Sequence, residues 1–288
     1  MLKTATCFLI LLFLSSCSQN RDGDFYSEAE AFEGIIDGKQ VSERSTPAAK
    51  SIVLIEVINA EGLAYGACTA TLIGQRTILT AAHCFDPRIF GNIKSFNIIF
   101  ETSYRSSGQR IARRGLKYKL HPNYNSERDS KYGFKVYDHD IAVAVFSGEL
   151  PSGFGVVTMD RDKDADYSNQ SVYVYGYGRS IDYSGRQGED IRYSWGALRR
   201  GMMKVYSSYK DKPDRYLSSS DSPNELCQGD SGGPQFIQDQ KGLRIIGVNS
   251  ASYGSRLPNG MQSCTGPSQG TKVAPFQAWV TQQMRRML

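Results

Sequence analysis

Cys227-Gln228-Gly229-Asp230-Ser231-Gly232-Gly233-Pro234 is the stretch of this chain that says most about its chemistry. Small and turn-forming residues surround one serine, and glycine permits backbone conformations and close approaches that a Cβ atom would prevent. Such a loop can present the Ser231 hydroxyl in a cleft and point its own N–H groups at the same place. Acyl transfer requires this combination of a nucleophile and donors for the oxyanion. We therefore predict a nucleophilic serine; the alternative is a glycine-rich turn that merely contains one.

A serine hydroxyl is a weak nucleophile until a neighbouring base accepts its proton. The chain has three histidines that could serve as this base. His83 lies in Thr80-Ala81-Ala82-His83-Cys84, directly after an apolar, strand-like run, and is the candidate. His121 reads as a loop histidine, and His139 reads as structural.

Asp140 is the candidate for a third catalytic residue. It begins the apolar run Asp140–Phe146, and a carboxylate buried at the start of a strand could fix the tautomer of a histidine. Asp138 is a weaker candidate because no such run follows it directly. Spacing alone does not show that His83, Asp140 and Ser231 meet.

Short β-rich runs separated by Gly, Asn and Ser turns recur from Ile35 onward, which predicts an all-β sandwich or barrel. The clearest runs are 51–58, 70–73, 77–80, 96–100, 140–146, 171–175 and 243–248. Apolar residues after Pro275 recur at helical spacing and predict an amphipathic helix over 275–288. Two polar stretches without a strand pattern, 123–136 and 181–195, read as enlarged loops.

The 288 residues are enough for one large domain or two small ones. The net charge of +5 is mild, and the sequence holds no zinc-type spacing, phosphate-binding loop or nucleotide fingerprint. We therefore expect no nucleic-acid partner and no metal site. One local excess of basic residues reads as a solvated face, with an anion-binding patch as the alternative: Arg105, Arg110, Arg113, Arg114, Lys117 and Lys119.

The N-terminus reads as an export signal, because Lys3 precedes a seven-residue apolar run that is too short to span a bilayer. Leu14-Ser15-Ser16-Cys17 resembles a bacterial lipobox, so we expect a lipoprotein-type signal peptide over 1–16 and lipidation of Cys17. An ordinary signal cleaved nearby, leaving a free thiol, is the alternative. Residues 17–34 are polar and acidic and read as a tether or pro-segment.

Four cysteines remain once Cys7 and Cys17 are set aside, and an even number in an exported chain suggests two disulfides. They allow three pairings. The local pairing, Cys68–Cys84 with Cys227–Cys264, is our choice, and four buried thiols are the alternative.

The chain resembles the trypsin/chymotrypsin family of serine proteases in three motifs that occur in the family's order. They are Thr80-Ala81-Ala82-His83-Cys84, Asp140-Ile141-Ala142-Val143 and Gly229-Asp230-Ser231-Gly232-Gly233-Pro234. Ile35-Ile36-Asp37-Gly38 is similar to the family's mature N-terminus. The resemblance covers 35–288 and implies two six-stranded antiparallel β-barrels, about 35–155 and about 156–274, followed by the C-terminal helix at 275–288.

The resemblance also implies a role for each matching residue. Ser231 would attack the scissile carbonyl, His83 would act as general base and then acid, and Asp140 would orient and stabilise the imidazolium. The N–H groups of Gly229 and Ser231 would form the oxyanion hole, and both cysteine pairs match the family. Ser250 would line the cleft beside the substrate backbone. No metal or organic cofactor is required, and the partner is a protein or peptide substrate of a monomeric enzyme.

Four positions depart from the family's pattern around the specificity pocket, and one of them, Ala251, replaces the family's usual cleft tryptophan. Glu225 stands where family members that cut after Lys or Arg usually carry aspartate, which indicates a basic substrate side chain. Glutamate is one methylene longer, however, and could fill the pocket or pair internally. Ser252 and Ser268 occupy wall positions where glycine is common.

The family's activation chemistry implies a cut before Ile35, because Asp230 is present to receive the new amine. Gly34 precedes the cut where a basic residue is frequent, so a trypsin-like activating protease does not fit. We expect a protein exported from a bacterial cell, held to a membrane by Cys17 or secreted after processing. The leading function is a serine endopeptidase; a non-catalytic binding protein with a protease fold and a latent, surface-interacting lipoprotein are the alternatives.

Overall fold

The computed structural model describes residues 35–106, 108–128, 135–182, 194–208, 214–218, 222–258 and 260–288. Contacts divide the chain into Met1–Ala31 and Phe32–Leu288, and every described residue belongs to the second unit. The predicted signal peptide, the tether and Cys17 lie outside the described residues. No helix within the described ranges combines the length and the apolar character that a bilayer crossing requires.

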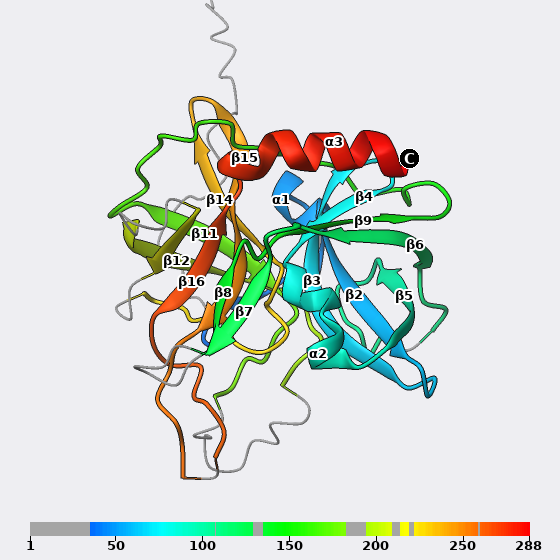
Figure 1. Ribbon diagram of the computed structural model, residues 1–288, viewed down its shortest axis with the longest axis horizontal. Helices are drawn as coiled ribbons and strands as arrows, with labels where there is room; N and C mark the ends of the chain where they lie inside the picture. The colour runs from blue at the N-terminus through cyan, green and yellow to red at the C-terminus, as the bar shows by residue number, and fades with distance from the viewer. Residues whose placement is uncertain are drawn as a thin grey trace, which may run out of the picture. The chain divides into compact units, whose positions relative to one another are not determined.

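The described residues form mostly β-structure with three short helices and two 3₁₀ turns (Figure 1). The strands are β1 Lys39–Gln40, β2 Ile52–Asn59, β3 Ala64–Gly74, β4 Thr77–Thr80, β5 Ile93–Ile99, β6 Ala112–Leu120, β7 Asn125–Arg128, β8 Lys135–Asp138, β9 Ala142–Phe146, β10 Thr158–Met159, β11 Ser171–Gly176, β12 Arg199–Ser208, β13 Arg215–Ser218, β14 Pro234–Asp239, β15 Gly242–Ser252 and β16 Ser268–Lys272. The other elements are α1 Pro47–Lys50, η1 Ala82–Phe85, α2 Pro87–Phe90, η3 Ala274–Phe276 and α3 Gln277–Met287.

Six strands close into a barrel in the order β2-β3-β4-β9-β6-β5. Strand β2 is almost entirely buried, and so are β4 and β9, because their apolar side chains face the barrel interior or the elements packed around it. Gly115 on β6 makes room for an aromatic ring, since a Cβ atom there would lie 2.1 Å from the Phe96 side chain. The predicted first barrel is confirmed.

The second half of the protein is an eight-stranded sheet in the order β1-β12-β11-β14-β15-β16-β13, with β10 beside β15. Strand β12 pairs with β13 as well as with β11 and β1. The pair β10–β15 is parallel, whereas the other pairs in this sheet are antiparallel. A buried cluster that includes Val174, Val205, Tyr216 and Ile246 packs within this half.

The stretch 123–136 is not simply an enlarged loop, as its polar sequence suggested. Asn125–Arg128 pairs antiparallel with Lys135–Asp138 to form the separate two-stranded sheet β7-β8. A strand shows alternating hydrophobicity when one of its faces is buried, and Asn125 and Ser126 are only partly buried. At these two described positions, no buried face produces the alternation that would reveal β7 in the sequence. Of the second expected loop, 181–195, residues 183–193 lie outside the described ranges.

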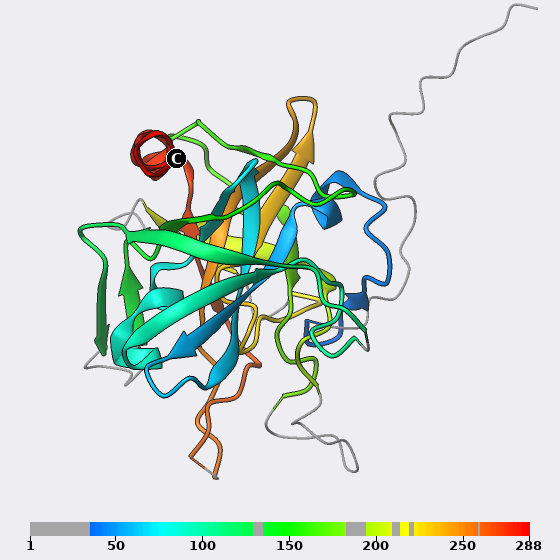
Figure 2. The same ribbon diagram turned by 90° about the vertical axis from the view of Figure 1, so that its right-hand side faces the viewer.

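The predicted C-terminal helix is confirmed, although it begins later than expected. Pro275 lies in the 3₁₀ turn η3, and the α-helix α3 starts at Gln277. Val280 and Gln283 are buried on the face of α3 that contacts β9. Figure 1 shows α3 at the top of the view, above β4 and β9, and Figure 2 views the helix end-on.

Two histidines fasten α3 and its preceding turn to the barrel. The His121 and His139 rings stack with centroids 5.2 Å apart and an angle of 8° between their planes. Phe276 and Trp279 each meet the His121 ring edge-on at 4.9 Å. Burial lowers the pKa of His121 below its usual range, and the neighbouring His139 lowers it further.

This packing predicts a loss of stability in acid that depends on His121. The pKa of His121 is lower in the folded chain than in the unfolded chain. The contribution of neutral His121 to the free energy of unfolding is therefore present above the unfolded pKa of about 6.5, and it is lost as the pH falls through the folded pKa. His121→Phe keeps an aromatic ring against Phe276 and Trp279. The free energy of unfolding, measured with urea, should fall less between pH 8 and pH 5 in this variant than in wild type. Equal losses in both proteins would contradict the prediction.

Candidate active site

The pairing of β4 with β9 brings His83 and Asp140 to the same edge of the barrel. Thr80 lies opposite Ala142, so the turn after β4 and the residues before β9 emerge side by side. His83 lies in the turn η1, and Asp140 is fully buried. Asp138, the weaker candidate, instead forms an ion pair with Arg215.

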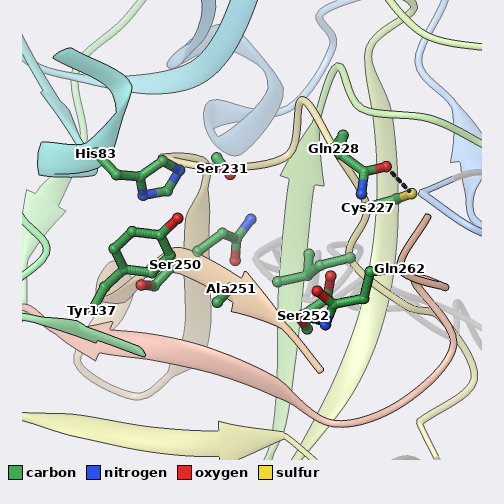
Figure 3. Close-up of a pocket in the computed structure, with 11 residues that line it drawn as sticks. His83, Tyr137, Cys227, Gln228, Ser231, Ser250, Ala251, Ser252 and Gln262 are labelled. Atoms are coloured by element: carbon green, nitrogen blue, oxygen red, sulfur yellow. Dashed lines mark hydrogen bonds between the residues drawn. The ribbon is translucent and has the colours of Figure 1, made fainter. Parts of the chain in front are cut away.

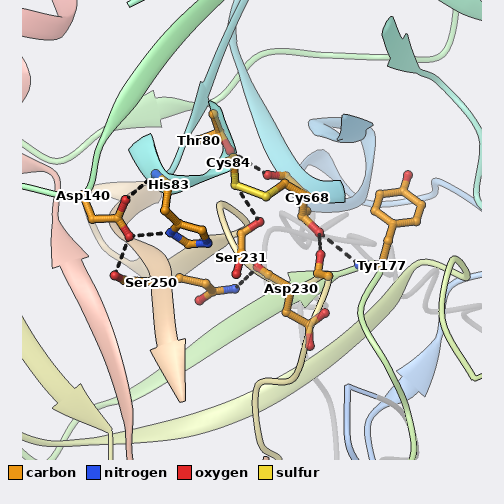
Figure 4. The surroundings of a disulfide bond; sticks show 12 residues. Cys68, Thr80, His83, Cys84, Asp140, Tyr177, Asp230, Ser231 and Ser250 are labelled. Atoms are coloured by element: carbon orange, nitrogen blue, oxygen red, sulfur yellow. Dashed lines mark hydrogen bonds and ion pairs between the residues drawn. A yellow bond between two sulfur atoms is a disulfide. The ribbon is translucent and has the colours of Figure 1, made fainter. Parts of the chain in front are cut away.

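Asp140 holds the imidazole of His83 in one orientation (Figure 4). Its Oδ2 lies 2.7 Å from His83 Nδ1, while its Oδ1 accepts the backbone N–H of His83 at 2.8 Å. The Ser250 hydroxyl also donates to Oδ2, at 2.6 Å. Both carboxylate oxygens are therefore engaged, and the arrangement turns Nε2 of His83 away from Asp140.

Ser231 lies in the same cavity as His83 (Figure 3). The loop that carries it is held from two sides: Thr69 donates its N–H to the Ser231 carbonyl at 2.9 Å, and Gly232 donates to the Asn249 carbonyl at 2.8 Å. Figures 3 and 4 both show the imidazole beside Ser231. The cavity has a volume of about 180 Å³. The structure thus brings together the three residues that the sequence singled out.

The backbone at Ser231 and two residues before it has N–H groups without an acceptor in the part of the chain that the structure describes. Gly229 has a φ of 100°, in the region that favours glycine. Among the described residues, neither the N–H of Gly229 nor that of Ser231 donates to an acceptor. Two unengaged donors next to a serine hydroxyl could stabilise negative charge on a carbonyl oxygen.

Two disulfides hold the segments that surround the site. Cys68 is bonded to Cys84, directly after His83, and Cys227 is bonded to Cys264. These are the pairs that we chose from the sequence and that the resemblance implied. The first joins β3 to the histidine turn, and the second joins the serine loop to the segment before β16.

Asp230 is fully buried, next to Ser231 in the sequence. Its carboxylate accepts the N–H groups of Gly178 at 2.8 Å and of Cys227 at 2.9 Å. Burial raises the pKa of Asp230 to about 7, against the opposing effect of these two bonds and of the more distant Arg199. Within the part of the chain that the structure describes, Asp230 forms no ion pair, so its charge lacks a cationic partner.

The segment 35–38 runs beside the serine loop. Ile36 and Glu225 exchange backbone hydrogen bonds of 3.0 Å and 3.4 Å. Ile35 is fully buried and has a φ of 45°, which is strained for a β-branched residue.

The expected pocket residues do not all reach the cavity. Ser250 and Ser252 line it, whereas Glu225 and Ser268 do not. The Glu225 carboxylate accepts the N–H of Gly266 at 3.1 Å and lies close to Thr265, and burial raises its pKa. Ser268 is fully buried on β16, where its backbone bonds with the Ser218 side chain.

Two residues that the sequence did not reveal line the cavity instead. Tyr137, on β8, stacks on the His83 ring with centroids 4.8 Å apart, and burial raises its pKa to about 12. Gln262 reaches the cavity from the segment before Cys264 (Figure 3). Neither residue lies in a motif or a periodic run, so only the folded arrangement identifies them.

Comparison with known proteins gives the family. The family described as Trypsin matches residues 35–280. The chain therefore belongs to the trypsin family of serine proteases, whose members are serine endopeptidases as a class.

Individual relatives are distant. A fibrinolytic enzyme, isozyme C, of Lumbricus rubellus is 25% identical over 233 residues, which cover 76% of this chain and 88% of that protein. Trypsin-3 of Salmo salar is 25% identical, with coverage of 76% and 84%. Anionic trypsin of Canis lupus familiaris is 24% identical over 250 residues, with coverage of 85% and 87%. The family rests on the match over residues 35–280, whereas identities this low leave the activity and specificity of this chain to its own residues.

The close approach at Gly229 predicts a stability cost that a second glycine can calibrate. A Cβ atom at Gly229 would lie 2.8 Å from the Gly178 Cα, whereas one at Gly242 would meet nothing within 4 Å, and both residues have positive φ. Each alanine substitution should cost about 1–2 kcal/mol in backbone strain. Gly229→Ala should cost about 1–3 kcal/mol more, from overpacking. Guanidinium unfolding of both variants tests this, and equal costs would contradict it.

Proposed function

We propose that the protein is a serine endopeptidase in which Ser231, His83 and Asp140 form the catalytic triad. The observation that carries the proposal is that the Asp140–His83 hydrogen bond and the Ser231 hydroxyl meet at one cavity, beside two unengaged N–H groups. Membership of the trypsin family supports the same reaction class.

The geometry supports the following acylation step. Ser231 Oγ attacks the scissile carbonyl while His83 Nε2 accepts its proton, and Asp140 stabilises the resulting imidazolium through Nδ1. The carbonyl oxygen becomes an oxyanion that accepts the N–H groups of Gly229 and Ser231. His83 then gives the proton to the departing amine, which leaves an acyl-enzyme on Ser231.

Deacylation uses the same groups in reverse. Water takes the place of the amine and attacks the acyl carbonyl while His83 accepts its proton. The second tetrahedral intermediate then collapses: the bond to Ser231 Oγ breaks, His83 returns the proton to Oγ, and the carboxylic acid product leaves. Tyr137, stacked on His83, and Ser250, bonded to Asp140, keep the imidazole in place through both steps. They act as positioning residues.

The proposal includes the family's two-barrel architecture in a monomer. The pairing of β12 with both β11 and β13 supports a second barrel over the strands β11 to β16, with β1 and β10 added outside it. The preference for Lys or Arg that Glu225 suggested has less support, because Glu225 does not line the cavity.

We also propose that the chain is made as an inactive precursor, cut before Ile35 by an activating protease. Three observations support this: the strain at Ile35, the docking of Ile36 against Glu225, and the buried carboxylate of Asp230. A new amine at Ile35 would supply the cation that Asp230 lacks. If Cys17 carries a lipid anchor, the same cut would free the enzyme from it.

Replacement of the nucleophile tests the reaction. Ser231→Ala should lower kcat/KM for peptide hydrolysis on the order of 10⁴-fold or more, because the residual rate then depends on binding and the oxyanion hole alone. It should also abolish labelling by a fluorophosphonate. Ser152→Ala, at an exposed serine in a turn, is the control and should behave as wild type. Labelling that survives in Ser231→Ala would reject the assignment.

Replacement of Asp230 tests activation in two measurable ways. In the uncleaved protein, the raised pKa of Asp230 means that its contribution to stability is present at low pH and is lost as pH rises through about 7. The gap between the ordinary carboxyl pKa and this value corresponds to about 4 kcal/mol, so Asp230→Asn should flatten the fall in unfolding free energy between pH 4 and pH 7.5. A wild-type precursor whose stability stays constant over this range would contradict the burial argument.

In protein cut before Ile35, Asp230→Asn should lower the activity. The amine would then be buried without its anion, which typically costs about 3–5 kcal/mol. We therefore expect a loss of kcat/KM on the order of 10²-fold or more, whereas wild-type protein gains activity on cleavage. N-terminal sequencing of active protein that begins at Cys17 or Ser18 would reject this activation route.

A further inference from the structure

The cavity beside Ser231 is walled by an amide where an acid was expected. Leu226, Cys227, Ala251 and Ser252 line it together with Gln262, and no Asp or Glu is among the described residues that do so. Figure 3 shows Gln262 beside Ser252, on the opposite side of the cavity from His83. The amides of Gln228 and Asn249 also line the cavity. Gln228 Oε1 lies against the sulfur atoms of the disulfide, and the Asn249 amide is bonded to the Asp230 carbonyl and to Gln235. A substrate side chain that enters between the lining residues therefore meets aliphatic groups, the disulfide and the amide of Gln262.

Gln262 is held in place by an anchored turn. The backbones of Arg256 and Gln262 form an isolated antiparallel β-bridge. On either side of it, the N–H of Leu257 donates to the Met261 carbonyl at 2.8 Å, and the N–H of Ser263 donates to the Ser255 carbonyl at 2.9 Å. The base of this turn is tied down by Asp182, whose carboxylate accepts the Ser263 hydroxyl and the Cys264 N–H, each at 2.7 Å. The Cys227–Cys264 disulfide adds a covalent tie to the serine loop.

The amide of Gln262 is also oriented. Its Nε2 donates to the Ser252 carbonyl at 3.1 Å, on the strand that lines the cavity. That bond uses one of the two Nε2 hydrogens. The second hydrogen and the Oε1 lone pairs remain available to hydrogen-bond a substrate. A carboxamide has the complementary donor and acceptor, so it can form two hydrogen bonds with Gln262.

Glu225 is engaged elsewhere. Its carboxylate accepts the N–H of Gly266 and lies outside the cavity lining. A Lys or Arg side chain in the cavity would lose its hydration without contacting an anion, and burying an unpaired charge is costly. An uncharged side chain carries no such cost.

We propose, on the basis of the endopeptidase function above, that Gln262 is the specificity-determining residue and that the enzyme prefers to cleave after uncharged, amide-bearing side chains. Glutamine at the cleaved residue should be favoured over Lys and Arg. Gln262 would contact the end of this side chain, while Leu226 and Ala251 would pack on its aliphatic part. Glu225 serves to hold the segment around Gly266 and does not contact the substrate.

The test uses protein processed before Ile35 and a set of peptides that differ only in the cleaved residue: Gln, Leu, Lys, Arg and Glu. Wild type should cleave after Gln at least about tenfold better than after Lys or Arg, because a hydrogen-bonding site rejects side chains that leave its groups unpaired. Gln262→Glu should move the preference toward Lys and Arg by about tenfold or more, since it adds the missing anion. Glu225→Gln, which alters the carboxylate outside the cavity, should leave the ranking unchanged.

Two results would overturn the inference: a Lys or Arg preference that Glu225→Gln abolishes, or a ranking that Gln262→Glu does not alter. Thermal unfolding of each variant establishes that it is folded. Fluorophosphonate labelling of Ser231 separates this inference from the function on which it rests. Labelled enzyme with the wrong ranking rejects only the role of Gln262, whereas unlabelled, correctly processed enzyme rejects the endopeptidase proposal itself.

Discussion

The site depends on one buried threonine that joins the barrel to the serine loop. Thr69, on β3, donates its N–H to the Ser231 carbonyl at 2.9 Å and its hydroxyl to the Gly229 carbonyl at 2.8 Å. Its own carbonyl accepts the Thr80 hydroxyl, at the end of the strand that leads to His83. The position of Ser231 relative to His83 is therefore set by hydrogen bonds from the Thr69 N–H and from two buried threonine hydroxyls to main-chain carbonyls.

This contact explains the glycines of the motif as much as the chemistry does. A Cβ atom at Gly232 would lie 2.0 Å from the Thr80 hydroxyl oxygen and 2.4 Å from the Thr69 carbonyl oxygen. The loop can approach the barrel this closely only without a side chain there. The same sequence thus satisfies a packing constraint against β3 and β4, and it leaves the N–H groups of Gly229 and Ser231 without an acceptor among the described residues. A motif that meets both requirements is specific, which is why it was informative in the sequence.

The residues that could be predicted are those whose positions follow from strands. Asp140 and His83 flank the strands β9 and β4, which pair in the structure. The apolar runs beside them marked each residue as a candidate in the sequence, whereas only the family resemblance implied that the two meet. The cavity wall is different, because it depends on a turn around Gln262 that has no hydrophobic period. That turn is fixed by Asp182, about 80 positions earlier in the chain, through bonds to Ser263 and Cys264. Glu225 was expected in the cavity from its place in the sequence alone, which could not reveal that Gly266 would engage its carboxylate.

Under the proposed activation, the buried carboxylate of Asp230 and the cavity wall share one anchor, Cys227. The backbone N–H of Cys227 donates to Asp230, and the Cys227 side chain is bonded to Cys264, two residues after Gln262. A carboxylate accepts this N–H more strongly than a neutral carboxyl does, because charge-assisted hydrogen bonds are the stronger ones. Burial raises the pKa of Asp230 to about 7, so burial opposes ionisation of this carboxyl. A cation beside Asp230 would favour the carboxylate and so strengthen the hydrogen bond from the Cys227 N–H. A stronger bond there would restrict the motion of Cys227 and its neighbour Leu226, which both line the cavity. The Cys227–Asp230 hydrogen bond and the Cys227–Cys264 disulfide would therefore couple the ionisation of Asp230 to the serine loop and to the turn that carries Gln262.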